Sequence, residues 1–455
     1  MNIQENLTIA RDDEKSRRMS EGEVYKGIRI YVVTLLVLTV VAWCAVGIGR
    51  YTLHGPYPHP SLLAPETPFT DFTYLSARIA HFGEPNMLSR TDFMEPFAYP
   101  VPSIYAYLIF IRLFPNPLAA YLAFALLSFF IATYCFSLRV KRIAPGWLPQ
   151  VAVWSTLLGF PLVILIDRGN IEAVIWVLVL LGIAAYTRNR ILTSAILWAL
   201  ATSMKITSGL LFVLFLAKRK YGMFVLAIVA TVAFSVLALA GVGPTIRQAA
   251  SDSSKNAPYL RDTFILARVS PQLDESLFGA TKQIIYLYTY AHGGSFLDRS
   301  QMSLVFLTAL YLYNVLITLA CILLYWFRLR RLPLLNQFMA YLVLYILLPQ
   351  VSYEYKLVYI YFAWGAFLLF LLADAATGRS EIPAWSIHVI LFSCAVIFVP
   401  LTPFAVATSA GHTFTFGGQV KAVFLIVILL TVLRVPMPSS LFGDLQLPAP
   451  RNART

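Results

Sequence analysis

The chain has 455 residues, of which 59% are hydrophobic and only 13% are charged. Soluble domains typically carry about 25% charged residues, so this composition excludes an ordinary soluble protein. The formal net charge of +13 does not require a nucleic-acid partner, because Lys and Arg gather in short connections between apolar stretches. Several of these stretches reach the roughly 20 residues that cross a bilayer as a helix. We therefore expect an all-α polytopic integral membrane protein with about 10–12 transmembrane helices.

The basic connections set the expected orientation, because short loops rich in Lys and Arg stay in the cytoplasm. They lie at 139–142, 188–190, 218–220 and 328–331. The polar residues 1–27 are then expected as a cytoplasmic tail, and the Pro-rich residues 435–455 as a second, disordered one. Residues 28–434 form the membrane domain, with long outer loops at about 51–100 and 244–300.

In chain order, long spans are expected at 28–48, 118–138, 148–166, 171–186, 221–242, 304–327, 332–348, 357–373, 384–401 and 420–433. The apolar segment 101–114 is short, so we expect it at half depth or in the interface. Only 27 residues separate the basic loops 188–190 and 218–220, whereas two spans need about 40. We therefore expect a re-entrant hairpin of two half-helices, 191–203 and 207–217, with Lys205 between them.

Two polar segments at the expected outer face raise the question of a site. Asp71 opens an amphipathic run that includes Tyr74, and the simplest interpretation is that Thr70 or Asp71 caps a helix. Further along, "DRGNIE" (167–172) joins two apolar runs. A tight turn explains its Gly, which tolerates a left-handed conformation, and its Asn, which caps the next helix.

The charged residues of the second segment are harder to explain as a turn. Ionisable groups at the end of a span usually face a cavity or a partner. The alternatives are an ion pair of Arg168 with Asp167 or Glu172, and a binding cavity. Lys205 poses the same choice: it pairs, binds an anion, or extends its ammonium to the inner headgroups.

A third outer segment, "LPQVSYEYKLVYIY" (348–361), places Tyr353, Glu354, Tyr355 and Lys356 between two spans. Tyrosines at a membrane interface are usually anchors. A Glu–Lys pair flanked by tyrosines also suits a sugar and phosphate site, and the sequence leaves both interpretations open.

The order of these motifs resembles glycosyltransferase family 87, a member of the polytopic C-type glycosyltransferase superfamily. The resemblance rests on "TDFTY" (70–74), "FAYPVPSIY" (97–105), "DRGNIE" (167–172), "LATSMKITSGLLFVLFLAKRK" (200–220) and "VSYEYKL" (351–357). It implies the C-type fold and inverting sugar transfer at the outer face of the plasma membrane. The donor implied is a polyprenyl-phosphate sugar, mannose-like or another hexose or pentose, and the acceptor is a lipid or glycan. No cofactor is implied beyond that donor.

The resemblance also assigns roles. The general base of the family is an aspartate of the first outer loop, which Asp71 matches. Departing phosphate needs cations as its charge develops, and the candidates are Arg168, Lys356, Lys205, Arg261 and Arg268. The substrate-binding candidates are Tyr74, Asp167, Asn170, Glu172, Tyr353, Glu354 and Tyr355.

Two features separate the chain from the family pattern. "YPVP" replaces the usual Tyr-Pro-Pro, and "SYEYKL" lacks the histidine that related proteins carry nearby; His412 is too distant to take its place.

A monophosphate leaving group does not strictly require a metal, so none is expected. The alternative function is a transporter or flippase for a lipid-linked saccharide, although no inverted repeat is visible in the sequence.

Overall fold

A computed structural model describes residues 21–53, 69–84, 87–89, 99–157, 159–266, 274–291, 299–377, 382–401, 406–407, 413–414 and 417–438. This part of the chain is almost entirely helical, which confirms the all-α prediction. The exceptions among the described residues include β1 (Val406–Ala407) and β2 (Thr413–Phe414), which form a two-residue antiparallel pair.

Among the described residues, seven candidate spans are long and apolar enough to cross a membrane, so the chain is a polytopic membrane protein. Three single helices that supply spans are α5 (Pro117–Ile143), α11 (Tyr221–Val242) and α18 (Gly417–Arg434). The other four spans come from α2 (Glu21–Leu53), the pair α6 (Trp147–Leu157) and α7 (Phe160–Arg168), α14 (Arg299–Phe327) with η4 (Leu329–Arg331), and η5 (Glu354–Tyr359) with α16 (Ile360–Thr377).

Six further apolar helical segments have only 10–17 residues. They are α4 (Pro102–Leu113), α8 (Glu172–Thr187), α9 (Ile191–Met204), η1 (Ile206–Phe212) joined to α10 (Val213–Ala217), α15 (Leu334–Leu347) and α17 (Ala384–Phe398). Three of the expected long spans, 171–186, 332–348 and 384–401, therefore fall in this shorter class. The helices α3 (Thr70–Ile79), α12 (Ile246–Leu260), η2 (Arg261–Ile265) and α13 (Leu277–Ala291) lie within the two expected outer loops.

Local chemistry explains several helix boundaries. α4 and α5 both begin at a proline, which has no N–H to leave unsatisfied in the first turn. The side chain of Asn116 caps α5 by accepting the N–H of Ala119 at 3.1 Å. The expected span 148–166 is divided at Gly159, whose backbone is extended (φ −62°, ψ 148°).

The predicted half-helices around Lys205 are present. α9 ends at Met204, the backbone at Lys205 is extended (φ −156°, ψ 110°), and the chain resumes as the 3₁₀ helix η1 before α10. α9 packs against both α8 and α11. That this hairpin is re-entrant in the membrane stays a prediction.

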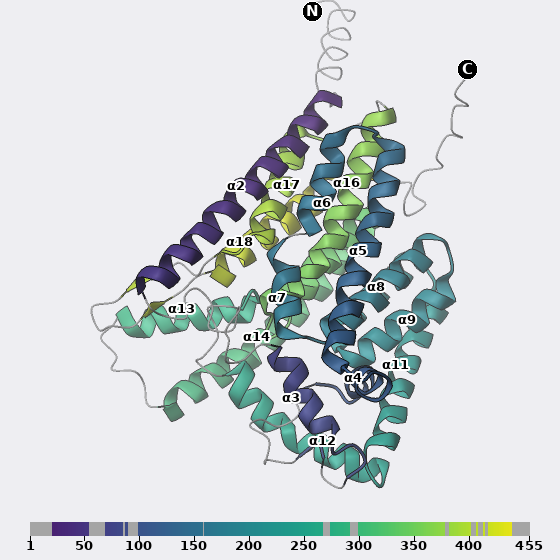
Figure 1. Ribbon diagram of the computed structural model, residues 1–455, viewed down its shortest axis with the longest axis vertical. Coiled ribbons are helices and arrows are strands. Elements are labelled where there is room, and N and C mark those ends of the chain that lie inside the picture. Colours follow the sequence, from purple (N-terminus) through teal and green to yellow (C-terminus); the bar gives the residue numbers. More distant parts are fainter. Residues whose placement is uncertain are drawn as a thin grey trace, which may run out of the picture.

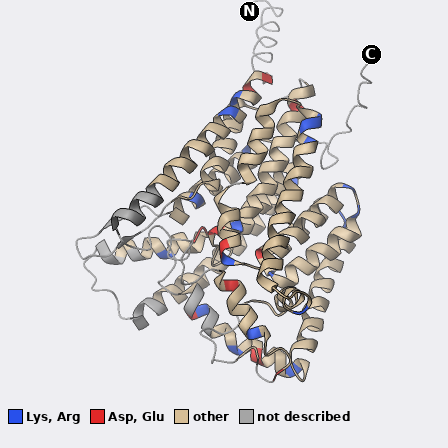
Figure 2. Cartoon of the chain, viewed as in Figure 1, with Lys and Arg blue, Asp and Glu red and all other residues tan. Residues whose placement is uncertain are grey.

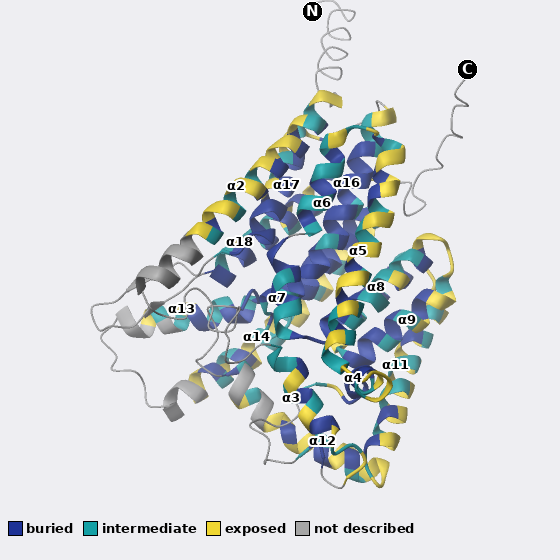
Figure 3. Ribbon diagram, in the orientation of Figure 1, coloured by how far each residue is buried: buried dark blue, intermediate teal, exposed yellow. Residues whose placement is uncertain are grey.

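Burial separates the core of the bundle from its apolar outer surface (Figure 3). The span that contains α16 is 78% buried, whereas those containing α11 and α14 are 11% and 6% buried. Exposed leucines and valines on such helices are expected where a helix faces lipid tails. α17 lies beside α2 and α18, and α3 packs against α4 and α7 (Figure 1).

Candidate active site

Asp71 lies in the first turn of α3, and its carboxylate faces the 167–170 turn. The Nη2 atom of Arg168 donates to its Oδ1 at 2.7 Å. The side-chain amide of Asn170 and the Tyr99 hydroxyl both donate to its Oδ2, the latter at 3.4 Å. The side chain remains 12% exposed. Three donors thus orient a carboxylate that is still accessible.

This arrangement corrects the simplest interpretation of the first polar segment. The residue at the N-cap of α3 is Phe69, in a left-handed conformation, and no side chain caps this helix end. The cap that was expected from Thr70 or Asp71 is therefore wrong. The Asp71 carboxylate binds a segment almost 100 residues away, so its contacts connect α3 to the turn after α7.

The "DRGN" turn has both a structural and a chemical role. Gly169 has φ 61° and ψ 36°, and a Cβ added there would lie 2.7 Å from the Cβ of Phe72. Only glycine fits this contact with α3 without strain. The side-chain oxygen of Asn170 accepts the N–H of Glu172 at 3.0 Å, while its amide group reaches Asp71. The N-cap residue of α8 is Ile171 rather than the expected Asn170, so this asparagine forms a local turn before the helix and holds the carboxylate.

A second ion pair lies deeper. Glu172 is fully buried, pairs with the ammonium of Lys205, and accepts the Tyr359 hydroxyl at 2.6 Å. The expected pairing of Arg168 with Asp167 or Glu172 is therefore wrong, because Arg168 pairs with Asp71 and Glu172 pairs with Lys205. The backbone carbonyl of Asp167 accepts the N–H of Phe69 at 2.9 Å. The Lys205 side chain is only 16% exposed, so it does not extend to the headgroups.

Two ammonium groups meet beside this pair. Lys205 lies over the Tyr355 ring, 5.4 Å from its centroid, and is near enough to Lys356 to be repelled by it. Lys356 is only 4% exposed, and its Nζ donates to the carbonyl of Val351 at 2.5 Å. Within the described part of the chain no carboxylate lies at ion-pair distance from Lys356. Buried cations in this arrangement are suited to an anionic ligand.

Tyr99 and Tyr355 lie near the Asp71 carboxylate, and the ring of Tyr355 also lies beside Lys205. The Tyr355 hydroxyl interacts electrostatically with Asp71 and Arg168, while its ring meets Lys205. Burial, followed by repulsion from Asp71, raises the pKa of Tyr99 well above its usual value. Tyr99 therefore stays a neutral donor to the carboxylate at physiological pH. Figure 2 shows the acidic and basic residues together where α3, α7 and α8 meet, inside a largely uncharged bundle.

The loop that presents Tyr355 and Lys356 is held by a second buried network. The Oδ1 of Asp274 accepts the N–H groups of Ser276 and Ser352 at 2.9 and 2.8 Å. The N–H of Glu275 donates to the carbonyl of Ser352 at 2.8 Å. A Cβ on Gly418 would lie 2.9 Å from backbone atoms of Asp274, so α18 also packs closely on this segment.

Charges within this network are only partly balanced. Glu354 pairs with Lys421 of α18 at 2.6 Å. Glu275 is fully buried, and neither of its carboxylate oxygens has a hydrogen-bond partner among the described residues. Burial, followed by repulsion from Glu354, raises the pKa of Glu275 well above its usual value, although the Lys421 ammonium opposes this rise. The side chain is therefore expected to hold a proton at pH values where a solvated glutamate has lost it.

Other expected site residues lie elsewhere. Tyr74 accepts Arg78 Nη2 at 3.2 Å, one turn further along α3. Arg261 is exposed and pairs with its neighbour Asp262 at 2.7 Å. The Tyr353 ring lies 6.0 Å from that of Tyr355, and its backbone is bridged to the 274–276 segment. Arg268 and His412 lie outside the described residues.

Sequence reasoning missed several of the polar groups. Tyr99 belongs to the motif "FAYPVPSIY" (97–105), but no sequence pattern indicated that its hydroxyl binds Asp71. Lys421 carried a stronger signal, because an ammonium within an apolar span demands a partner. Tyr359, Asp274 and Glu275 carried no comparable signal. No group of His, Cys, Asp or Glu side chains suited to hold a metal ion is found within the described ranges.

Comparison with known proteins gives one match. The profile of glycosyltransferase family 87 matches residues 97–352, more than half of the chain. The matched range contains Tyr99, Arg168, Asn170 and Lys205, and it begins after Asp71. Neither the curated proteins nor the solved structures gave a match.

Proposed function

The chain belongs to glycosyltransferase family 87, and from this we propose that it transfers a sugar, with inversion, from a polyprenyl-phosphate donor to a hydroxyl group. The acceptor proposed is a lipid or a glycan, at the outer face of the plasma membrane. One observation carries the proposal: an accessible carboxylate, Asp71, shares a polar cluster with two buried lysines. The first sugar to test is mannose, followed by other hexoses and pentoses.

Asp71 is proposed as the general base. As the acceptor oxygen attacks the anomeric carbon, its proton passes to the Asp71 carboxylate. The bond from that carbon to the phosphate oxygen breaks, and its electron pair leaves with the polyprenyl phosphate. Attack opposite the leaving group inverts the anomeric centre. Proton transfer to a positioned carboxylate typically contributes 10²–10⁴-fold to a rate.

The leaving phosphate is proposed to lie against Lys205 and Lys356. These ammonium groups come from different segments of the chain, at the end of α9 and in η5, and both are largely buried. A phosphate near them gains two cationic partners, and its increasing charge is stabilised most in the transition state. Arg168 links the two ends of the site, because one amino group holds Asp71 and the guanidinium fork has further donors.

The test uses the purified full-length protein in detergent with radiolabelled polyprenyl-phosphate mannose, arabinofuranose and glucose, together with lipids from the native membrane as acceptors. Release of free polyprenyl phosphate is followed for the wild type and for Asp71→Asn. Asp262→Asn is the matched control, because Asp262 is an exposed carboxylate that pairs with its sequence neighbour Arg261.

We expect release from one donor, a loss of about 10²-fold or more in D71N, and wild-type release in D262N. Equal release by D71N and the wild type refutes the role of Asp71. No release from any donor, combined with movement of a lipid-linked saccharide across reconstituted vesicles, favours the transporter instead.

A further inference from the structure

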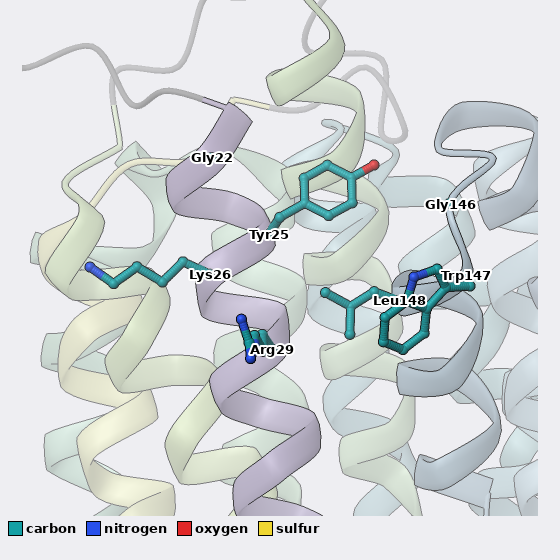
Figure 4. A pocket seen from close by; sticks show the side chains of 7 residues that line it. All are labelled: Gly22, Tyr25, Lys26, Arg29, Gly146, Trp147 and Leu148. Carbon is teal, nitrogen blue, oxygen red and sulfur yellow. The ribbon is translucent and has the colours of Figure 1, made fainter.

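A groove of about 620 Å³ opens between the first turns of α2 and the turn that joins α5 to α6. It is lined by Gly22, Tyr25, Lys26, Arg29, Gly146, Trp147 and Leu148 (Figure 4). The two glycines keep it open, since neither fills the space with a side chain. The groove and Asp71 lie at opposite ends of one candidate span, which begins at Trp147 and ends at Arg168.

The rim of the groove is cationic and aromatic. Arg29 is exposed, and it has no ion-pair or hydrogen-bond partner in the described part of the chain. Lys26 has one weak partner, Glu23, at 3.7 Å, and its side chain stays 63% exposed. Trp147 is 74% exposed. Exposed cations beside an interfacial tryptophan are typical of the boundary between lipid headgroups and acyl chains.

Below this rim, the same face of α2 becomes apolar. Val33, Leu36, Val37 and Val40 follow Arg29 at helical spacing, and they are 53%, 48%, 53% and 61% exposed. Eleven residues of helix extend about 16 Å, roughly half the thickness of the hydrocarbon core of a bilayer. One face of α2 therefore presents two cations at one end and an apolar stripe about one leaflet long.

We propose that this groove binds one anionic phospholipid. The headgroup phosphate lies against Arg29, with the indole N–H of Trp147 as a further donor, and an acyl chain follows the stripe on α2. The Lys26 ammonium extends to the other side of α2 in Figure 4, where it adds positive charge near the headgroup. The negative charge of this lipid complements the cationic rim of the groove, and its acyl chain matches the length of the apolar stripe on α2. Arg is suited to the phosphate, because its planar fork can donate two parallel hydrogen bonds.

The test measures lipid binding to the purified full-length protein by native mass spectrometry, with titrations of dioleoyl phosphatidylglycerol, dioleoyl phosphatidylcholine and decaprenyl phosphate. The variant K26Q/R29Q removes the two cations from the groove. The control R112Q/R247Q removes two exposed cations outside it. All four positions are exposed, so neither double variant is expected to unfold.

Each basic side chain near an anionic lipid surface contributes about fivefold to affinity, so K26Q/R29Q should bind phosphatidylglycerol about 30-fold more weakly. The control should stay within about threefold of the wild type. Equal affinity for the two phospholipids, or wild-type affinity in K26Q/R29Q, overturns the proposal. A preference for decaprenyl phosphate that K26Q/R29Q abolishes assigns the groove to the substrate lipid and overturns it as well. None of these outcomes depends on sugar transfer.

Discussion

Replacing Lys205 with methionine separates the two roles proposed for that residue. The Lys205 ammonium balances the charge of Glu172, which is fully buried. It also lies beside Lys356 and Tyr355, where the donor phosphate is proposed to bind. The single substitution K205M therefore affects both the stability of the fold and the affinity for the donor.

The structural part of this effect follows from burial. K205M leaves the Glu172 carboxylate hydrogen-bonded to the Tyr359 hydroxyl, at 2.6 Å, but without its cationic partner. Removing one partner of a buried ion pair costs about 3–5 kcal/mol, whereas replacing both partners with neutral groups is often close to neutral. We therefore expect K205M to unfold at a markedly lower temperature, and K205M/E172Q to recover most of that loss.

The functional part does not recover in the double variant. K205M/E172Q still lacks the ammonium group, so its KM for the polyprenyl-phosphate donor should rise about tenfold, as expected for the loss of one charge-assisted contact. The assay combines apparent melting temperatures in detergent with donor-release kinetics. A double variant that recovers both stability and donor KM would refute the phosphate role. A K205M variant as stable as the wild type would refute the ion-pair argument.

Three further predictions follow from other contacts. G169A should lower donor release at least tenfold, because the left-handed turn against α3 cannot accommodate a Cβ, whereas G222A, which meets open space, should match the wild type in the same assay. The buried Glu275 keeps a proton that the unfolded chain releases above about pH 4.5, so wild-type stability falls as pH rises. E275Q should therefore raise the melting temperature more at pH 8 than at pH 5, and an equal shift at both values argues against a protonated Glu275. Y99F removes a 3.4 Å hydrogen bond to Asp71 and should reduce kcat less than tenfold, far less than D71N; an equal loss would contradict this ranking.

Sequence patterns predicted most of the local architecture. The bounds 221–242 agree with those of α11, because an uninterrupted apolar run between a basic loop and a Gly-Pro turn has few alternatives. The interruption at Lys205 was also predicted, since the spacing of two basic loops left no room for two spans. Gly169 has the left-handed conformation that its chemistry indicates, whereas the N-cap expected at Asn170 lies at Ile171.

The pairing of charged groups was beyond the reach of sequence patterns. Arg168 had two acidic neighbours within four residues, yet it pairs with Asp71. Glu172 pairs with Lys205, and Glu354 pairs with Lys421. Each partner comes from a distant element, and only the packing of α3, α9 and α18 brings it close. Local spacing predicts contacts within a helix, but not which helices meet.

The sequence also predicted only in part where long spans divide into shorter helices. The run 148–166 contains Gly159 and Pro161, which divide it into α6 and α7. A hydropathy profile does not detect such a helix break, because the residues on both sides of it are apolar. The breaks at Gly159 and Gly169 bound α7, so that the end of this helix carries Arg168 to the Asp71 carboxylate.

The most direct test of the central claim is a comparison of kcat and donor KM between the wild type and D71N, using the donor that the wild type cleaves. If Asp71 accepts the proton of the acceptor hydroxyl in the transition state, kcat falls by about 10²–10⁴-fold while the donor KM stays within about threefold. If kcat is unchanged, or only KM rises, Asp71 contributes to binding alone and the proposed mechanism is wrong.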